Sequence, residues 1–168
     1  GMLTLIRPPA KRLFSFPGGS PVEVDLLPEE DDFGNYLAHQ NLVDAAELQA
    51  YQDRKRRGED PRDLFVKMGC LSPQRFEEES RRFLEERLIE CFGWSAGKAQ
   101  FDHKPSFVRS LHSATALLPA VFFRGFRTYL PPARLTAYLD AKGNAYVGRS
   151  PHFYEYRSHL AAETAGQK

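Results

Sequence analysis

Three short runs at the start of the chain are rich in apolar residues that alternate with polar ones, as is typical of β-strands. The runs cover Leu3–Ile6, Lys11–Phe16 and Pro21–Leu26, and the first two end at the turn signals Pro8-Pro9 and Pro17-Gly18-Gly19. Because the connections between the runs are short, we expect neighbouring runs to pair antiparallel, as a β-meander.

Two helical units follow, and they resemble each other at an offset of 28 residues. The matched pairs are Leu37 with Phe65, Asn41 with Gly69, Val43 with Leu71, Asp44 with Ser72, and Leu48 with Phe76. Asn41 and Gly69 are residue types that tolerate the left-handed conformation at the end of a helix. Asp44 and Ser72 are typical N-caps, and Glu47 completes a capping box with Asp44. Each unit therefore predicts a short helix, a left-handed stop and a capped longer helix.

The second long helix is predicted over residues 73–92, where apolar residues recur with helical spacing. Two charged pairs on its polar side, Glu77 with Arg81 and Glu78 with Arg82, have the i,i+4 spacing of helix ion pairs. The residues of its apolar stripe are Phe76, Phe83, Leu84, Leu88, Cys91 and Phe92.

Further elements are predicted in the second half of the chain. Gly93 ends the long helix, and Trp94–Phe101 predict a β-hairpin with its turn near Gly97. Leu118–Leu130 are apolar nearly all round and predict a helix buried on two sides, against the sheet and a partner chain. Pro132–Asp140 predict a shorter helix. The residues that we expect to form an interaction surface are Phe122, Phe123, Arg124, Phe126 and Arg127.

These elements together predict an α+β fold. It consists of an antiparallel β-meander plus hairpin packed with two helix-turn-helix-like units and a C-terminal aromatic helix. We expect residues 3–140 to form one domain and residues 141–168 to form a partly ordered C-terminal extension, with Ala145–Val147 as a further strand.

Composition narrows the class of protein. The chain has 168 residues, 42% of them hydrophobic, and a formal net charge of +1, which argues against a strongly basic nucleic-acid binder. No apolar run approaches the roughly 20 residues of a membrane span, and Leu3–Ile6 is too short for a signal peptide. Cys70 and Cys91 are too few for a disulfide scaffold, so we expect a reducing, cytoplasmic setting.

The sequence contains no specific pattern of catalytic or ligand-binding residues. It has no phosphate-binding glycine loop and no nucleophile elbow, and its five histidines show no zinc-type spacing. The acidic stretch Glu29–Asp32 lacks the alternation and glycine of a calcium loop, which favours a solvated loop. We therefore expect no enzymatic activity, no cofactor and no metal site.

One alternative function is single-stranded nucleic-acid binding, because stacking aromatics and cations are interspersed in the C-terminal half. The cations are Arg124, Arg127, Arg134, Arg149 and Arg157, and the aromatics are Phe126, Tyr129, Tyr146, Tyr154 and Tyr156. The low net charge makes nucleic acid a less favoured partner than protein.

Five short motifs stand out between about Leu3 and Leu135: Gly18-Gly19-Ser20-Pro21-Val22, Phe33-Gly34-Asn35-Tyr36-Leu37, Phe65–Ser72, Cys91–Phe101 and Val121–Arg127. Through these motifs the chain resembles the PATAN family, named for the N-terminal domain of PatA-type bacterial response regulators. Ala99 departs from the family pattern, where an aromatic is usual, and so does Asn41, where glycine is usual.

The resemblance implies a non-enzymatic protein–protein interaction or regulatory module in bacterial signal transduction. Such modules are often joined to receiver domains, and the family brings no catalytic residues to carry over. We expect a protein partner, for which a second copy of this chain is one candidate, forming a homodimer.

The helical repeat is also similar to the N-terminal domain of type II secretion and type IV pilus ATPases, some of which bind cyclic di-GMP. Their ligand motif combines an arginine with a glycine turn. Here Asp32-Phe33-Gly34 lacks the arginine and Pro61-Arg62-Asp63 lacks the glycine. The resemblance implies, as an alternative function, a cyclic-di-nucleotide sensor that uses cations between Arg54 and Arg62.

Overall fold

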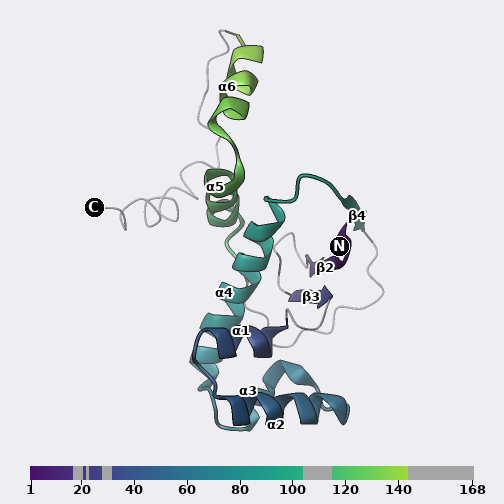
Figure 1. The fold of residues 1–168 in the computed structure, drawn as a ribbon, viewed down its shortest axis with the longest axis vertical. Helices are drawn as coiled ribbons and strands as arrows, with labels where there is room; N and C mark the ends of the chain where they lie inside the picture. The colour runs from purple at the N-terminus through teal and green to yellow at the C-terminus, as the bar shows by residue number, and fades with distance from the viewer. Residues whose placement is uncertain (17–20, 22, 28–31, 104–114, 144–168) are drawn as a thin grey trace, which may run out of the picture. The chain divides into compact units, whose positions relative to one another are not determined.

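The computed structural model describes residues 1–16, 21, 23–27, 32–103 and 115–143 (Figure 1). The chain divides into two compact units, of which the first comprises Gly1–Glu86 and Ala96–Ala116 and the second Arg87–Ser95 and Leu117–Lys168. The predicted extension lies outside the described residues from position 144 onward, as does the predicted strand Ala145–Val147, so both stay predictions.

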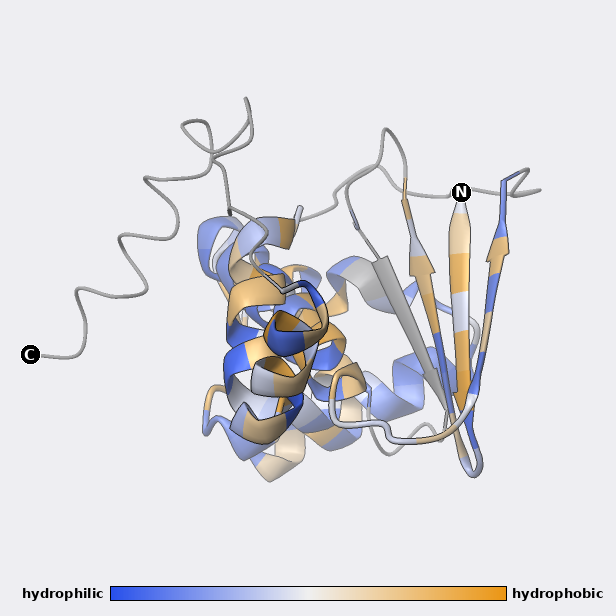
Figure 2. Ribbon diagram, turned by 90° about the horizontal axis from the view of Figure 1, so that it is seen from above, coloured by the Kyte–Doolittle hydropathy of each residue, from blue (hydrophilic) through white to orange (hydrophobic). Residues whose placement is uncertain are grey.

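The first unit contains a four-stranded antiparallel sheet with the order β3-β2-β1-β4. Its strands are β1 (Met2–Arg7), β2 (Ala10–Ser15), β3 (Glu23–Leu27) and β4 (Lys98–Asp102). The first three follow one another in sequence and in space, which confirms the predicted meander. Apolar and polar residues are mixed along the coloured strands in Figure 2. Arg12 and Phe14 of β2, two residues apart and therefore on one face of the sheet, are buried.

The predicted hairpin over Trp94–Phe101 is wrong. Residues 94–97 form no strand, and β4 pairs with β1 instead, with Leu3 opposite Phe101. Gly97 directly precedes β4. A Cβ built on it would lie only 2.7 Å from the Ile6 carbonyl oxygen of β1. The glycine therefore marks a close approach of two backbones, not the turn of a local hairpin.

The helical part of the first unit follows the predicted order. It consists of α1 (Phe33–His39), α2 (Ala45–Arg56), a 3-10 turn, η3 (Pro61–Asp63), with α3 (Leu64–Lys67), and the start of α4 (Pro73–Cys91). Strands and helices occupy separate stretches of the chain, apart from β4, which confirms the α+β class.

Both short helices end in the same way, 28 residues apart. Asn41 and Gly69 have φ angles of 56° and 76°, the left-handed conformation predicted for them. The amide of Leu42 donates to the carbonyl oxygen of Leu37 at 3.0 Å, and the amide of Cys70 donates to that of Phe65 at 2.9 Å. In each helix the left-handed residue itself donates a second bond, from Asn41 to the Ala38 carbonyl oxygen and from Gly69 to that of Val66, both at 3.0 Å. The two bonds at each helix end form a Schellman motif, which satisfies carbonyl groups there.

The long helices begin with the predicted caps. The Asp44 carboxylate accepts from the Glu47 amide at 2.8 Å, and the Glu47 carboxylate accepts from the Asp44 amide at 2.8 Å, a complete capping box. At the equivalent place in the second unit of the repeat, the Ser72 hydroxyl oxygen accepts from the Arg75 amide at 3.2 Å. The repeat is therefore present in hydrogen bonding as well as in sequence.

The same offset relates the buried residues of the core. Leu37 and Phe65 are both fully buried, and Val43 and Leu71 both lie below a tenth of their full exposure. Tyr51 of α2 stacks on Phe65 of α3, with 4.4 Å between ring centroids. The buried cluster consists of Tyr36, Leu37, Val43, Tyr51, Leu64, Phe65, Leu71 and Phe83. Contacts between the two repeats thus build one shared core, as expected of repeats that cannot bury their apolar faces alone.

The predicted ion pairs of α4 are rearranged. Glu78 pairs with Arg75 at 3.7 Å, and Arg82 pairs with Glu79 at 3.3 Å, so i,i+3 contacts replace the predicted pair of Glu78 with Arg82. The reason is that Glu79 lies on the buried side of the helix and draws the neighbouring arginines toward it.

The second unit contains the end of α4 and two further helices, α5 (Leu118–Tyr129) and α6 (Pro132–Ala141). Each has a proline in its first turn, Pro119 in α5 and Pro132 in α6, which suits this position because proline has no amide to leave unpaired. Within the described part of the chain, no helix combines the length and the apolar character needed to cross a bilayer.

Candidate interaction surface

Three phenylalanine rings gather where α5 meets the end of α4. Phe122 and Phe126 are one helical turn apart on α5, and their rings stack with centroids 6.1 Å apart. Phe92 meets both rings edge to face, at 5.6 Å from Phe122 and 5.2 Å from Phe126. These are favourable geometries for aromatic pairs. We call Phe92, Phe122 and Phe126 the aromatic face.

Two glycines allow the aromatic face to form. A Cβ built on Gly125 would lie 2.5 Å from Cδ2 of Phe92, and one built on Gly93 would lie 2.7 Å from Cε1 of Tyr129. Each glycine therefore leaves space for a ring carried by the other segment. Because any side chain on Gly125 would displace the Phe92 ring, the identity of this residue fixes how closely the two segments pack.

The aromatic face is only partly covered. The side of α5 that contains Val121 is buried, with 2% of that residue exposed, whereas Phe122 is 47% and Phe126 51% exposed. The aromatic side of α5 is thus exposed in the single chain, and its predicted burial against a partner chain stays a prediction. Single exposed apolar residues are ordinary, but adjacent stacked phenylalanines are the kind of surface that binds proteins.

The other predicted surface residues do not all join Phe122 and Phe126. Phe123 is partly buried, and Arg124 is half-buried and has an interaction of its own. Arg127 is exposed, but it follows Phe126 by one position, about 100° around the helix axis. Since residues one or two apart do not share a helix face, the predicted set of five lies on more than one side of α5.

Helix α6 presents a second apolar surface that sequence reasoning did not identify. Leu135, Tyr138 and Leu139 are 47%, 60% and 48% exposed, and α6 has no buried residue. Their i, i+3, i+4 spacing places them on one face, which we call the α6 face. The ammonium group of Lys142 lies 5.4 Å from the centre of the Tyr138 ring. This spacing was visible in the sequence and is the signal that could have identified the surface.

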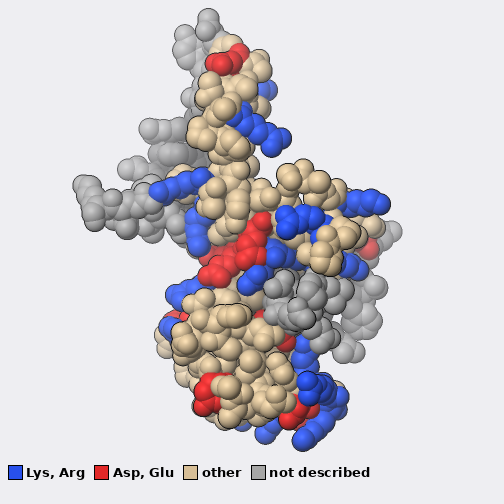
Figure 3. All heavy atoms as spheres, in the orientation of Figure 1, with Lys and Arg blue, Asp and Glu red and all other residues tan. Residues whose placement is uncertain are grey.

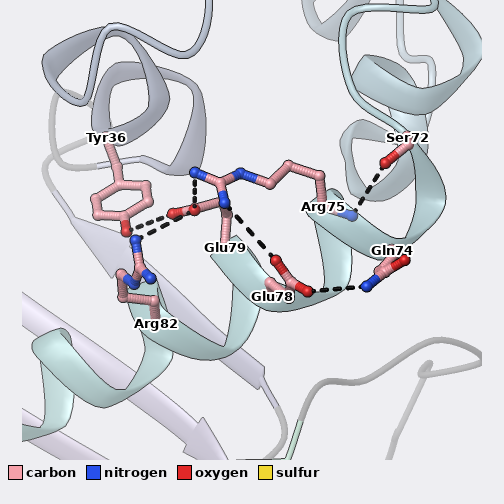
Figure 4. A network of polar contacts seen from close by, with 7 residues as sticks. All are labelled: Tyr36, Ser72, Gln74, Arg75, Glu78, Glu79 and Arg82. Atoms are coloured by element: carbon pink, nitrogen blue, oxygen red, sulfur yellow. Dashed lines mark hydrogen bonds and ion pairs between the residues drawn. The ribbon is translucent and has the colours of Figure 1, made fainter.

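Sequence reasoning also missed a buried carboxylate in the first unit, Glu79 (Figure 4). The side chain is fully buried and accepts a hydrogen bond of 3.0 Å from the Tyr36 hydroxyl group. Arg75 lies 2.9 Å and Arg82 3.3 Å from the other carboxylate oxygen. Glu79 is three residues after Phe76, within the apolar stripe, so a carboxylate at an apolar position was the signal.

The partners of Glu79 explain how a charge can be buried there. Two guanidinium groups and a hydroxyl group together compensate the carboxylate, as a buried charge requires. Burial, then the charge of Glu86 and the hydrogen bond to Glu79, raise the pKa of Tyr36 far above its ordinary value. Tyr36 therefore stays protonated and donates to the carboxylate. The cluster thus links α1 to α4 through the buried Glu79 carboxylate, which the Tyr36 hydroxyl group and two arginines already engage.

Most cations of the stretch proposed for nucleotide binding, Arg54–Arg57, lie at the end of α2, whereas Arg62 lies in η3. Figure 3 shows Lys and Arg gathered there, with acidic side chains among them. Lys55 pairs with Asp32 at 3.0 Å and Arg56 with Asp53 at 3.1 Å. Arg54 lies 3.8 Å from Glu59. Carboxylates thus already pair with Arg54, Lys55 and Arg56, which makes these three cations less suited to bind phosphate.

The remaining candidate residues show no chemistry beyond structural contacts. Burial, then a hydrogen bond with Glu47, raises the pKa of the Cys70 thiol, and Cys91 donates from Sγ to the Arg87 carbonyl oxygen at 3.1 Å. Both thiols are thus held in contacts of the fold. Among the described residues, no cluster of His, Cys, Asp and Glu can hold a metal ion. The acidic residues 29–31 lie outside that set.

Comparisons of the chain with protein-family models, with curated proteins and with solved structures found no match. The likeness to the PATAN family therefore rests on the motifs in the sequence, and the role that it implies is taken up as a proposal.

Proposed function

We propose that this chain is a non-enzymatic protein–protein interaction module whose docking surface is the aromatic face. The observation that carries the proposal is the pair of stacked rings, Phe122 and Phe126, each about half exposed on a helix whose other side is buried. A role in bacterial signal transduction is supported by the resemblance to the PATAN family.

The geometry suits a docking surface. Aromatic side chains dominate the binding energy of many interfaces because they bury a large area at a low cost in conformational entropy. Phe92 packs edge to face against both rings, and Gly125 leaves space for the Phe92 ring. The two exposed rings are therefore already positioned, and binding of a partner costs little further side-chain entropy. The partner surface must therefore be apolar enough to cover two phenylalanine rings, whether it belongs to another protein or to a second copy.

The test compares the wild type with the double variant Phe122→Ser, Phe126→Ser. Light scattering at increasing protein concentration reports self-association, and affinity capture with mass spectrometry reports other protein partners. We expect the wild type to associate with one defined partner or with itself. Loss of two anchor rings at the centre of an interface should weaken that association by about thirtyfold or more.

Phe101→Ser is the matched control, because Phe101 is 46% exposed and belongs to the first unit. It removes an exposed ring without touching the aromatic face, so it should leave the association unchanged. A wild type that stays monomeric and captures no protein would contradict the proposal. Equal binding by the wild type and the double variant would contradict it as well.

A further inference from the structure

Helix α6 lacks the contacts that normally stabilise a helix of its length. All ten of its residues are exposed, including Leu135, Tyr138 and Leu139 on the α6 face. Isolated helices shorter than about 12–15 residues are marginal in water, and most helical stability in proteins comes from packing of an apolar face. The α6 face is therefore a candidate docking surface.

The chain itself supplies a candidate occupant immediately after α6. The helix ends at Ala141. Gly143, two residues further on, has a left-handed φ of 58°, and its amide donates to the Asp140 carbonyl oxygen at 3.0 Å. Twenty-five residues follow, 144–168. Their large apolar residues are Tyr146, Val147, Phe153, Tyr154, Tyr156 and Leu160.

The length of this segment is sufficient to reach the α6 face. Leu135 lies eight residues before Gly143, which is about 12 Å along a helix. An extended chain covers that distance in about four residues, so Phe153 and the residues after it have length to spare. A tethered segment has an effective concentration on the order of millimolar, well above that of a second copy in a dilute solution. The tether thus favours the segment of the same chain.

We propose that residues 144–168 dock on the α6 face of the same chain and cover Leu135, Tyr138 and Leu139. The proposal concerns α6 and does not rest on the function proposed for the aromatic face of α5. Crosslinking distinguishes this segment from a second copy of the chain, which is another candidate occupant of the α6 face.

The experiment places the photo-crosslinker p-benzoylphenylalanine at position 138 of the full chain, where it replaces an exposed aromatic residue. The matched control carries it at position 137, which is also exposed on α6 but turned about 150° away from the centre of the α6 face. After irradiation, mass spectrometry maps each adduct and separates adducts within one chain from those between chains. We expect position 138 to form adducts with residues 144–168 of its own chain, in at least tenfold higher yield than position 137.

Three outcomes would overturn the proposal: adducts between two chains, adducts only with residues before 144, and equal yields from positions 138 and 137.

Hydrogen exchange of the full chain provides a second measurement. The triple variant Phe153→Ser, Tyr154→Ser, Tyr156→Ser should accelerate exchange of the α6 amides at least tenfold, with α2 as the internal reference. The control variant His152→Ser, Ser158→Ala, His159→Ser should not. Unchanged α6 exchange in the triple variant would refute docking.

Discussion

Glu79 shows at the scale of one residue how a polar group can hold a core together. It lies at the position equivalent to Tyr51 in the repeat, 28 residues earlier, and both residues are buried. Tyr51 reaches from the first repeat to Phe65 in the second, while Glu79 reaches from the second to Tyr36 in the first. The two contacts are reciprocal, but one is an aromatic stack and the other is a hydrogen bond to a carboxylate. Removing a partner of Glu79 should be costly, because it leaves a buried charge less well compensated.

The first prediction concerns the Tyr36 hydroxyl group. Tyr36→Phe removes the hydrogen bond to Glu79 and should lower the free energy of unfolding by about 2 kcal/mol, as for bonds to charged groups. Urea denaturation of the two proteins measures the difference. Tyr138→Phe is the control, since an exposed hydroxyl group should contribute less than about 0.5 kcal/mol. An equal effect of the two substitutions would refute the role given to the cluster.

The same group should make stability fall in alkaline solution. The folded state raises the pKa of Tyr36, so the unfolded chain releases this proton first once the pH exceeds about 10. The stability that Tyr36 contributes is therefore complete below that pH and declines above it. The stability difference between the wild type and Tyr36→Phe should shrink between about pH 9 and about pH 11. A difference that stays constant across this range would contradict the prediction.

The effect of Gly125→Ala on the stability of α5 depends on two opposing factors, the space beside residue 125 and its helix propensity. Alanine is favoured over glycine in a helix by about 1 kcal/mol, but its Cβ would meet the Phe92 ring at 2.5 Å. Overpacking costs about 1–3 kcal/mol, so Gly125→Ala should destabilise α5, measured by hydrogen exchange of its amides. In a Phe92→Ala background the clash disappears, and the same substitution should become neutral or stabilising. A cost that persists without the ring would show that the clash is not its cause.

At the scale of elements, the helical repeat could be read from the sequence because its signals are local. A left-handed residue, a cap and apolar spacing all act within a few positions, as Asn41, Asp44 and Glu47 illustrate. The hairpin over Trp94–Phe101 failed for the opposite reason. The partner of β4 is β1, almost a hundred residues away in sequence, and local patterns contain no information about such pairing.

The left-handed conformation of Gly69 should tolerate asparagine better than alanine. A Cβ on Gly69 would meet nothing within 4 Å, so only its φ of 76° opposes a side chain. Gly69→Ala should therefore cost about 1 kcal/mol of unfolding free energy, from backbone strain alone. Gly69→Asn should cost less, because Asn41 already adopts this conformation at the equivalent position. Thermal denaturation that ranks asparagine below alanine would contradict this account.

At the scale of the whole molecule, stability and interaction are expected to reside in different residues. The buried cluster of the first unit contains several of the largest fully buried side chains, such as Leu37 and Phe65. The exposed large apolar residues belong mainly to the second unit. The sequence predicted α5 and its aromatic residues, but exposure depends on tertiary packing, so the two sides of the helix could not be told apart in advance. The i, i+3, i+4 spacing of the α6 face can be read in the sequence, but its exposure likewise depends on tertiary packing.

Buried and exposed apolar residues should differ in how much their substitution destabilises the fold. Leu37→Ala, in the buried cluster, should lower the free energy of unfolding by about 2–5 kcal/mol through the cavity that it leaves. Phe126→Ser, on the aromatic face, should cost about 1 kcal/mol or less because half of its ring is already in water. Calorimetry of each variant measures both effects. A larger loss from Phe126→Ser would mean that the aromatic face belongs to the core.

The pairing of β1 with β4 has a consequence for how the protein is made. Translation delivers β1 first and β4 only after all of α1–α4 has been synthesised. Until then, one side of β1 has peptide groups with no strand beside them, which is the kind of open edge that invites pairing with foreign strands. The intervening helices assemble through short-range contacts, which form quickly. They therefore have time to fold on the ribosome, and the sheet is the part of the nascent chain that most needs protection from aggregation.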